Sequence, residues 1–348
     1  MFKRVLVPLD GSVRAERAIP VAARIAHASG GSVVLLRVAP IPIDYGLMTP
    51  SVNYVEDIVD TELSGAGSYL EAVSKSSVLA GVAVETSTLV GIPAQTILAA
   101  VESYHIDLIV MCSHGNTGFK RWVLGSVAQK LVRYSPVPVF VLREGGAVPA
   151  HPHPDARPMR ALVALDGSAL AKAALMPAAY LVSALSVPGQ GALHLTRVVK
   201  PLFNEERNGQ SDFADNLKER NLYKAKKYLS SIVDHLRDGL VADFKLATTW
   251  SVAVDADVPH TLIRVAENGE DAEGAGVFGG CDFIAMATHG RSGLERWAMG
   301  SVTEHVLGAT RLPMLIVRPQ QVETKQELHG EEFAEVGIGG IHMGSSLF

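Results

Sequence analysis

The chain has 348 residues, 48% of them hydrophobic, and a formal net charge of −5. This length and composition allow two ordinary α/β cores. The acidic balance, without a basic stripe interleaved with aromatic residues, argues against nucleic acid as a partner. No apolar run approaches the ~20 residues of a membrane span, and the apolar stretch before Asp10 is too short for a signal peptide. We therefore expect a cytoplasmic protein without a membrane partner.

The first half of the chain alternates between strand-like and helix-like segments. Its short apolar runs end at turn residues and predict strands at 4–9, 32–38, 82–90, 107–112 and 137–143. Helices are predicted at 12–30, about 53–79, 92–104 and 126–134. Pro20 should kink the first of these helices or mark a late start. Regular alternation of this kind predicts a parallel sheet with helices on both faces.

One glycine-rich pattern occurs twice. Ser113-His114-Gly115 is followed, after nine residues, by Gly125-Ser126, and Thr288-His289-Gly290 is followed at the same spacing by Gly300-Ser301. The segment Val7-Pro8-Leu9-Asp10-Gly11-Ser12 also returns, as Val163-Ala164-Leu165-Asp166-Gly167-Ser168. The repeats indicate a whole-domain duplication.

The second copy is longer than the first. The separation between matching motifs grows along the chain, so the second copy contains insertions. The last insertion, the Gly- and acid-rich stretch 268–280, is predicted to be a surface loop. A helix over about 214–237 carries an apolar stripe that we interpret as core packing. The predicted organisation is a first domain at 1–144, a linker at 145–159, a second domain at 160–319 and a flexible C-terminal tail at 320–348.

A ligand site is expected where the first and fourth strands of each copy end. Ligands of open α/β sheets bind beyond the carboxyl ends of the strands, where the strand order reverses. Asp10 and Asp166 end the first strands, and each carboxylate could accept hydrogen bonds from a ribose or an adenine amine. The glycine loop leads into a helix N-terminus, which favours anions. Gly115, Gly118 and Gly125 would let the backbone approach a phosphate closely.

A structural interpretation of the same residues stays open. The segments beginning at Ser126 and Ser301 have Gln129 and Glu304 three residues later, which is the pattern of a capping box. Such boxes satisfy the helix's own amide groups and need no ligand. Because the spacing recurs in both copies, we favour anion binding.

Other chemistries find less support in the sequence. His114 and His289 have no second ligand at metal-binding spacing, so we expect loop-shaping roles and no metal site. His151-Pro152-His153 lies in a Pro-rich linker and is interpreted as a solvated spacer. A P-loop pattern with its lysine is missing, which argues against fast phosphoryl transfer.

The assembled motifs resemble the universal stress protein family, as a tandem pair covering nearly the whole chain. The resemblance rests on the opening Val-Pro-Leu-Asp-Gly-Ser, on Gly91-Ile92-Pro93, on Asp107-Leu108-Ile109-Val110-Met111 and on the glycine loop. It implies five-stranded parallel α/β domains of the Rossmann-like, adenine nucleotide alpha hydrolase-like type. Members of the family pair through their last strands, so the two copies should form a pseudo-twofold dimer within one chain.

The resemblance also implies adenine nucleotide sites. The ATP-binding branch carries Gly, two residues, Gly, nine residues and Gly-Ser/Thr; the first Gly is Cys112 in one copy and Ala287 in the other. The first site is expected to use Pro8, Asp10, Val38, Met111, Gly115, Gly118, Gly125, Ser126 and Val127. The second is expected to use Asp166, Val198, Met286, Gly290, Gly293, Gly300, Ser301 and Val302. ATP is the expected ligand, with ADP and AMP as alternatives and Mg²⁺ as an accompanying ion.

Three functions follow as hypotheses. The first is a non-enzymatic regulatory protein of the stress response that binds adenine nucleotide, forms a homodimer and acts on a regulatory protein partner. The second is an interaction module of the same fold that binds no nucleotide. Cys112 and Ala287 favour it, because they replace the first Gly of the ATP-binding pattern. The third is a slow ATPase in which His114 and His289 would position water.

Overall fold

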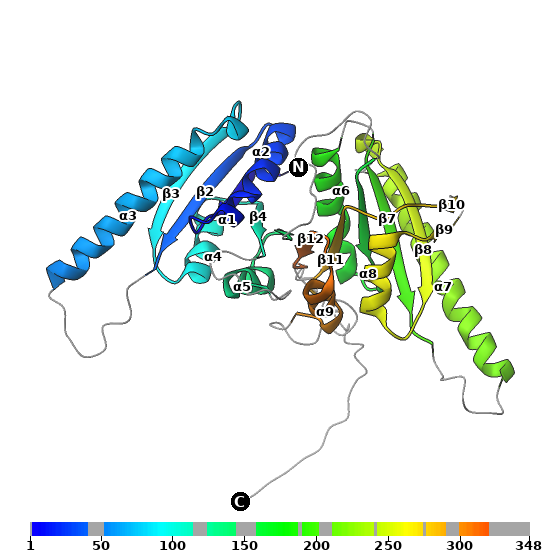
Figure 1. The fold of residues 1–348 in the computed structure, drawn as a ribbon. Helices are drawn as coiled ribbons and strands as arrows, with labels where there is room; N and C mark the ends of the chain where they lie inside the picture. Colours follow the sequence, from blue (N-terminus) through cyan, green and yellow to red (C-terminus); the bar gives the residue numbers. More distant parts are fainter. Residues whose placement is uncertain are drawn as a thin grey trace, which may run out of the picture.

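The computed structural model describes residues 2–40, 52–113, 124–143, 158–186, 190–201, 211–239, 242–273, 276–289 and 299–319. Within these ranges the chain forms two halves of similar design, which lie side by side in Figure 1. The strands of the first half are β1 (Arg4–Pro8), β2 (Ser32–Ala39), β3 (Ala83–Val90), β4 (Leu108–Cys112) and β5 (Val139–Leu142). Its helices are α1 (Val13–Glu16), α2 (Ala18–Ser29), α3 (Val52–Ser74), α4 (Pro93–Ser103) and α5 (Ser126–Tyr134), with a 3-10 turn at Ser77–Leu79.

The second half repeats this order with additions. Its main strands are β6 (Arg160–Ala164), β7 (Ala192–Val199), β8 (Ala247–Val254), β11 (Phe283–Ala287) and β12 (Met314–Val317). Its helices are α6 (Leu175–Leu185), α7 (Ser211–Asp238), α8 (Val258–Asn268) and α9 (Ser301–Ala309), with 3-10 turns at Leu170–Ala174 and Ala242–Phe244. The short strands β9 (Asp271–Ala272) and β10 (Gly276–Val277) form a separate antiparallel pair.

Both halves contribute to one ten-stranded sheet, in the order β3-β2-β1-β4-β5-β12-β11-β6-β7-β8. Neighbouring strands within each half are parallel, whereas β5 and β12 join the halves as an antiparallel pair with Leu315 opposite Phe140. The order reverses between β1 and β4 and again between β6 and β11, which creates two switch points. The expected fold class is confirmed, and the halves pair through their last strands.

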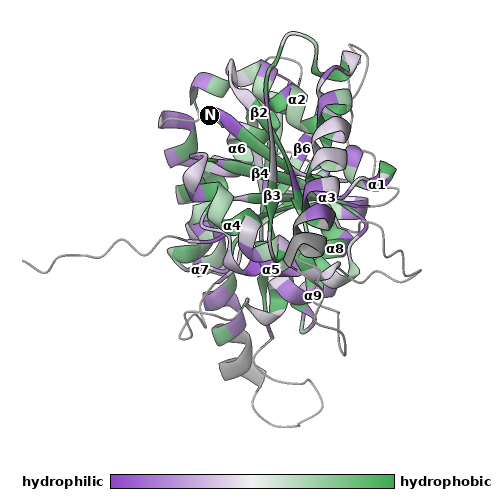
Figure 2. Cartoon of the chain, turned by 90° about the vertical axis from the view of Figure 1, so that its left-hand side faces the viewer, coloured by the Kyte–Doolittle hydropathy of each residue, from purple (hydrophilic) through white to green (hydrophobic). Residues whose placement is uncertain are grey.

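The inner strands of the sheet are buried on both faces because they are almost continuously apolar, whereas the edge strands β3 and β8 are more polar and partly exposed. Val5 and Val7 belong to the core on one face, and Leu6 belongs to the core on the other, as the twofold alternation of a strand requires. Helices α2 and α6 contact each other over the first face, while α4 contacts α5 and α8 contacts α9 over the second. In Figure 2 the strands at the centre are coloured as hydrophobic, and hydrophilic residues lie on the outward sides of the helices.

The helix after β1 begins late, which confirms one of the two expectations for Pro20. Helix α1 ends at Glu16, and α2 starts at Ala18 with Pro20 as its third residue. A proline in the first turn costs little, because the amide it lacks has no partner within the helix. Helix α2 ends at Gly30, whose φ of 61° places it in the left-handed region that suits glycine.

The apolar stripe on α7 packs into the core, as the sequence predicts. Ala225, Leu229, Ile232 and Leu236 are buried. The helix lies at the outer end of the second half in Figure 1, where it covers β7 and β8. Its equivalent, α3, covers β2 and β3 at the other end of the molecule.

The insertion at 268–280 is more ordered than the surface loop that we predict for it. It contains the β9–β10 pair, and Phe278 after this pair is buried against His194, with ring centroids 3.9 Å apart. The amide of Glu273 donates to the carbonyl of Trp250 on β8 at 3.0 Å. The predicted surface position is confirmed, since Val277 is exposed, but the expectation of a plain loop is wrong, because the stretch contains a strand pair and is anchored by one buried aromatic residue.

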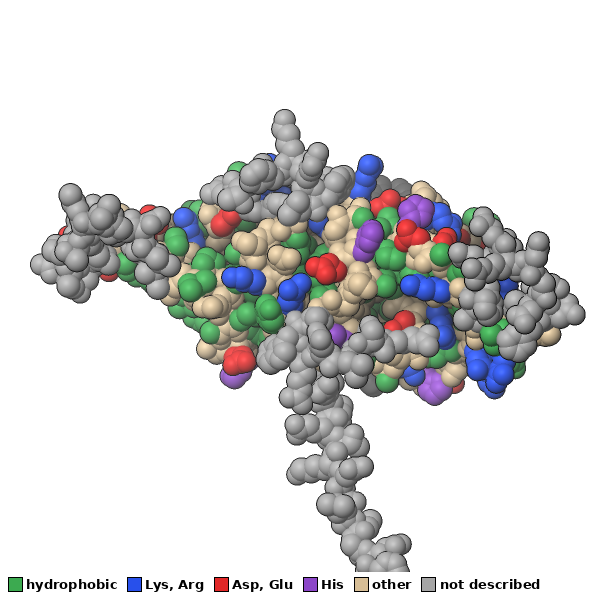
Figure 3. Space-filling view, turned by 90° about the horizontal axis from the view of Figure 1, so that it is seen from below, with side chains coloured by type: hydrophobic (Ala, Val, Ile, Leu, Met, Phe, Trp, Pro, Cys, Tyr) green, Lys and Arg blue, Asp and Glu red, His purple; other side chains and the backbone are tan. Residues whose placement is uncertain are grey.

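Most of the predicted linker and tail falls outside the described residues. Residues 145–157 of the linker and 320–348 of the tail are not described, so the domain bounds stay predictions. Among the residues that the structure describes, every helix is too short or too polar to cross a membrane. On the face shown in Figure 3, acidic and basic side chains lie among each other around the centre of the molecule.

Candidate functional site

Each half contains a cavity at its switch point. In the first half the cavity has a volume of about 270 Å³ and lies between the carboxyl ends of β1 and β4 and the start of α5. In the second half the cavity has about 600 Å³ and lies between the ends of β6 and β11, the start of α9 and the inner side of α7. Ligand pockets commonly measure ~300–1,000 Å³. The second cavity is therefore large enough for a nucleotide-sized molecule.

The described residues that the sequence singles out all line these cavities. In the first half these residues are Pro8, Asp10, Val38, Met111, Gly125, Ser126 and Val127. In the second half they are Asp166, Val198, Met286, Gly300, Ser301 and Val302. The remaining four, Gly115, Gly118, Gly290 and Gly293, lie outside the described residues.

The aspartate at the end of each first strand shapes the loop that follows it. Asp10 Oδ1 accepts from the amide and the hydroxyl of Ser12 at 2.9 and 2.6 Å. Asp166 Oδ1 accepts from the amide of Ser168 at 2.9 Å. These contacts make a local turn of the kind that Asp favours after a strand. Each carboxylate is thus fixed at the cavity wall by its own loop.

Helices α5 and α9 begin at the cavities without a capping side chain. The N-cap residues are Gly125 and Gly300, and neither helix start has a side-chain hydrogen bond. Ser126 and Ser301 are already the first helical residues, so the predicted capping boxes are wrong. The caps are glycines in extended conformation whose amides donate to the carbonyls of Ser113 and Thr288, both at 2.8 Å. This geometry leaves the first-turn amides directed at the cavity, where a helix terminus favours an anion.

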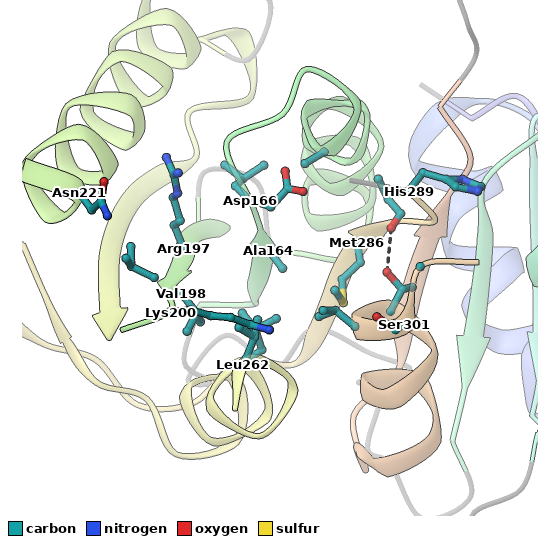
Figure 4. Close-up of a pocket in the computed structure, with 18 of the residues that line it drawn as sticks. Ala164, Asp166, Arg197, Val198, Lys200, Asn221, Leu262, Met286, His289 and Ser301 are labelled. Atoms are coloured by element: carbon teal, nitrogen blue, oxygen red, sulfur yellow. Dashed lines mark hydrogen bonds between the residues drawn. The ribbon is translucent and has the colours of Figure 1, made fainter. Parts of the chain in front are cut away.

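The start of α9 is tied closely to β11. Thr303 Oγ1 donates to the carbonyl of Ala287 at 3.0 Å, the contact drawn as a dashed line in Figure 4. A Cβ placed on Gly300 would lie 3.2 Å from the carbonyl oxygen of Thr288. The strand and the helix start therefore approach closely enough to favour glycine at the cap.

An arginine on the second strand stacks on a tyrosine of the long helix in both halves. The guanidinium of Arg37 lies 5.1 Å from the ring centre of Tyr69, and that of Arg197 lies 5.3 Å from that of Tyr228. Burial raises the pKa of both tyrosines. A hydrogen bond from Tyr69 to Glu16, 2.8 Å long, raises its pKa further. The repeated pair fixes the register between the second strand and the long helix in both copies.

The two cavities differ in charge. Arg197, Lys200, Asn221 and Lys224 line the second cavity. In Figure 4, Arg197 and Asn221 lie on the side away from α9, and Lys200 extends toward Leu262 of α8. Sequence reasoning misses these four residues. The repeat of Leu36-Arg37-Val38 as Thr196-Arg197-Val198 could have pointed to the arginine, because it occurs in both copies. The positions on α7 can be found only once the long helices are aligned.

The residues at the missing glycine positions also differ. Cys112 is half-buried and lines the first cavity, whereas the smaller Ala287 lines the second. The thiol of Cys112 occupies space that Ala287 leaves open, in agreement with the smaller volume of the first cavity.

His289 lies at the rim of the second cavity. Its Nδ1 is 2.9 Å from Thr288 Oγ1, while its buried Nε2 has no hydrogen-bond partner among the described residues. Figure 4 shows the ring directed away from Asp166 and Arg197. His114, its counterpart, lies outside the described residues. Among the described residues, no three His, Cys, Asp or Glu side chains are grouped so that they could hold a metal ion.

Comparisons with known proteins agree with this architecture. The model of the universal stress protein family matches residues 1–143 and 278–318, which is more than half of the chain. A universal stress protein of Thermus aquaticus is 35% identical over 145 residues, covering 41% of this chain and 100% of the relative. One from Methanocaldococcus jannaschii is 31% identical over 145 residues, covering 41% of this chain and 84% of the relative.

Solved structures show the same fold over nearly the whole length. A universal stress protein from Archaeoglobus fulgidus superposes with a TM-score of 0.58 at 20% identity, covering 90% of this chain and 98% of the other. A protein from Pseudomonas aeruginosa gives a TM-score of 0.52 at 17% identity, covering 91% and 93%. The repeated halves, the switch-point cavities and the family match together show that this chain belongs to the universal stress protein family.

Proposed function

We propose that the chain is a regulatory protein of the stress response that binds an adenine nucleotide, ATP, in the switch-point cavities. One observation carries the proposal: in each half, a helix that begins with a glycine and no capping side chain faces a carboxylate across a cavity. The first element suits phosphates, and the second suits the hydroxyls of a ribose.

The residues of the second half suggest how the ligand lies. The phosphates would meet the first-turn amides of α9, with the hydroxyl of Ser301 as a further donor. Asp166 would accept from the ribose, and Val198 and Met286 would supply apolar contacts to the base. The first half offers the equivalent set around Asp10 and Ser126. Gly115, Gly118, Gly290 and Gly293 would complete the phosphate loops.

Binding of this kind would act by stabilising one arrangement of the joined halves. A ligand at ~100-fold above its dissociation constant adds about 2.7 kcal/mol to the stability of the state that binds it. Because both cavities border strands of one continuous sheet, we expect this stabilisation to reach the whole molecule. A partner protein that binds only the stabilised arrangement would therefore bind when the cavities hold nucleotide.

Thermal unfolding with ATP tests the proposal. We expect ATP to raise the melting temperature of the parent protein, and Gly115→Val with Gly290→Val to abolish the shift because a branched side chain would obstruct the phosphate loops. ADP and AMP, measured in parallel, establish which nucleotide binds best. A parent protein that neither shifts nor binds ATP by calorimetry would be an interaction module instead, and the proposal would be wrong.

Slow ATP hydrolysis finds less support, because the ring of His289 is directed away from Asp166 and its Nε2 is buried. The test is phosphate release by the parent protein and by the His114→Ala, His289→Ala variant. Equal rates would leave binding as the function.

A further inference from the structure

The wall of the second cavity that β7 and α7 form is basic. Arg197 extends from β7 and Lys200 follows the end of the same strand, both labelled in Figure 4, and α7 contributes Lys224. The start of α9 lies on the other side of the cavity, beside Met286. The cavity therefore offers positive electrostatic potential at two separate places, the helix terminus and this basic wall.

The described part of the first half has no equivalent of this wall at the matching positions. The matching strands β2 and β7 place Pro40 where the second half has Lys200. The stacked pairs Arg37–Tyr69 and Arg197–Tyr228 align α3 with α7. In that register Gly65 matches Lys224, and Glu62 matches Asn221.

The different residues at these matching positions reverse the net formal charge at the mouth of the cavity. The three positions carry a formal charge of −1 in the first half and +2 in the second. Tyr69 hydrogen-bonds with Glu16, whereas Tyr228, its counterpart, has the ammonium of Lys172 5.5 Å from its ring centre. The two halves share one fold, so packing alone does not account for a more positive charge at each of these four positions, the three above and Glu16/Lys172.

Within the described ranges, the two lysines of the wall have no acidic partner. In the part of the chain that the structure describes, neither Lys200 nor Lys224 forms an ion pair or a hydrogen bond. Another lysine of α7 does: Lys226 Nζ lies 2.5 Å from Glu273 Oε1. Like charges around a cavity repel each other, and an anionic ligand that enters it relieves the repulsion.

From this wall we infer that the second cavity binds a nucleotide with phosphate groups on both sides of the ribose, a nucleoside bisphosphate. The inference rests on the proposed nucleotide site and specifies its ligand. One phosphate lies at the start of α9, and the other contacts Lys200 and Lys224. A nucleoside 5′-diphosphate carries the same number of phosphates at one end only, and leaves the basic wall without a partner. The first cavity makes no such distinction.

Calorimetric titration of the full chain compares adenosine 3′,5′-bisphosphate with ADP and AMP. We expect the bisphosphate to bind about tenfold or more tightly than ADP, the effect of one additional charge-assisted contact. Lys200→Gln with Lys224→Gln should remove this preference, because it weakens binding of the bisphosphate far more than binding of ADP. Lys218→Gln with Lys227→Gln, which changes two exposed lysines of α7 outside the cavity, should keep it.

The outcomes separate the inference from the function on which it rests. Binding of ADP and the bisphosphate with equal affinity would overturn the inference and leave the nucleotide site intact. A preference that survives in the Lys200, Lys224 variant would also overturn it, because the second phosphate would then lie elsewhere. Failure of all three ligands to bind would refute the proposed function and the inference together.

Discussion

Phe140 of the first half contacts Phe283 of the second half edge to face, with ring centroids 5.4 Å apart. Both side chains are almost fully buried, and they lie in the same hydrophobic core. The contact runs across the antiparallel junction of β5 and β12, so one core continues through both halves.

Truncation of this contact should destabilise both halves at once. Phe140→Ala is expected to lower the free energy of unfolding by about 3–5 kcal/mol, the usual cost of emptying a buried aromatic site. Chemical denaturation gives the free energy, and hydrogen exchange of β4 and β11 shows whether both halves lose protection. Phe140→Leu, which keeps most of the apolar volume, should cost much less. Loss of protection in β4 alone would contradict a shared core.

His194 should make stability depend on pH. Its ring nitrogens lie 2.8 Å from Thr249 Oγ1 and from Ser251 Oγ, and burial, with a smaller effect of Arg160, lowers its pKa to about 3. Because the unfolded chain titrates near 6.5, it binds more protons than the folded chain between these two values. The free energy of unfolding should therefore fall by up to about 1.4 kcal/mol for each pH unit below 6.

The matched comparison uses denaturation curves from pH 7 to pH 4. His194→Gln removes the titrating ring and should flatten the pH dependence, although the variant is less stable at pH 7. His27→Gln, at an exposed position, should leave the slope as it is. An unchanged slope in the His194 variant would show that the ring does not stay neutral in the fold.

Proline at the first position of α9 tests the phosphate contacts without breaking the helix. Proline is tolerated at this position, and the extended Gly300 before it, with φ −60° and ψ 140°, already suits a following proline. Ser301→Pro removes both the amide and the hydroxyl, whereas Ser301→Ala removes the hydroxyl alone. A hydrogen bond to a charged group contributes about 1.5–3 kcal/mol, so we expect Ser301→Pro to weaken ATP binding to the second cavity at least tenfold more than Ser301→Ala. Equal effects on calorimetric affinity would show that the amide does not contact the ligand.

Exchanging the side chains of Cys112 and Ala287 should weaken nucleotide binding in the second cavity and strengthen it in the first. Ala287→Cys narrows the second cavity and should weaken its nucleotide binding several-fold, while Cys112→Ala widens the first and should strengthen it. Binding stoichiometry and affinity of the two single variants measure both effects. If Cys112→Ala leaves the nucleotide affinity of the first cavity unchanged, the thiol does not limit binding there.

The ion pair between the helices beside the junction should matter little. Arg133 Nη2 and Glu304 Oε1 are 3.5 Å apart, and the side chain of Glu304 is 52% exposed. Exposed pairs of this kind contribute less than about 1 kcal/mol. Arg133→Ala and Glu304→Gln should therefore change the free energy of unfolding by less than that, measured at low salt where the pair is strongest. A larger loss would mean that the pair helps to hold the halves together.

The repeat predicts the fold because each strand is an apolar run bounded by turn residues. Periodicity also predicts α7, whose buried residues recur at helical spacing. Sequence patterns are less informative at the insertion, where composition predicts a loop but Phe278 anchors the segment. An isolated aromatic residue has no periodicity, so its burial against His194 appears only in three dimensions.

At the candidate site, too, the sequence predicts features set by local geometry and misses those set by packing. Motif spacing predicts the residues at the ends of the strands and the start of each helix, because those positions are fixed by the chain's local geometry. It misassigns the helix caps, since Gly125 and Gly300 occupy the position expected for Ser126 and Ser301. It misses Lys200 and Lys224, because the register between β7 and α7 depends on packing between segments far apart in the chain.

Mass spectrometry of the small molecules released when the purified chain is denatured tests nucleotide binding most directly. The account predicts an adenine nucleotide at one or two molecules per chain, with the second cavity as the site in the first case. It is contradicted if no nucleotide is released and none binds when ATP is added to the folded protein.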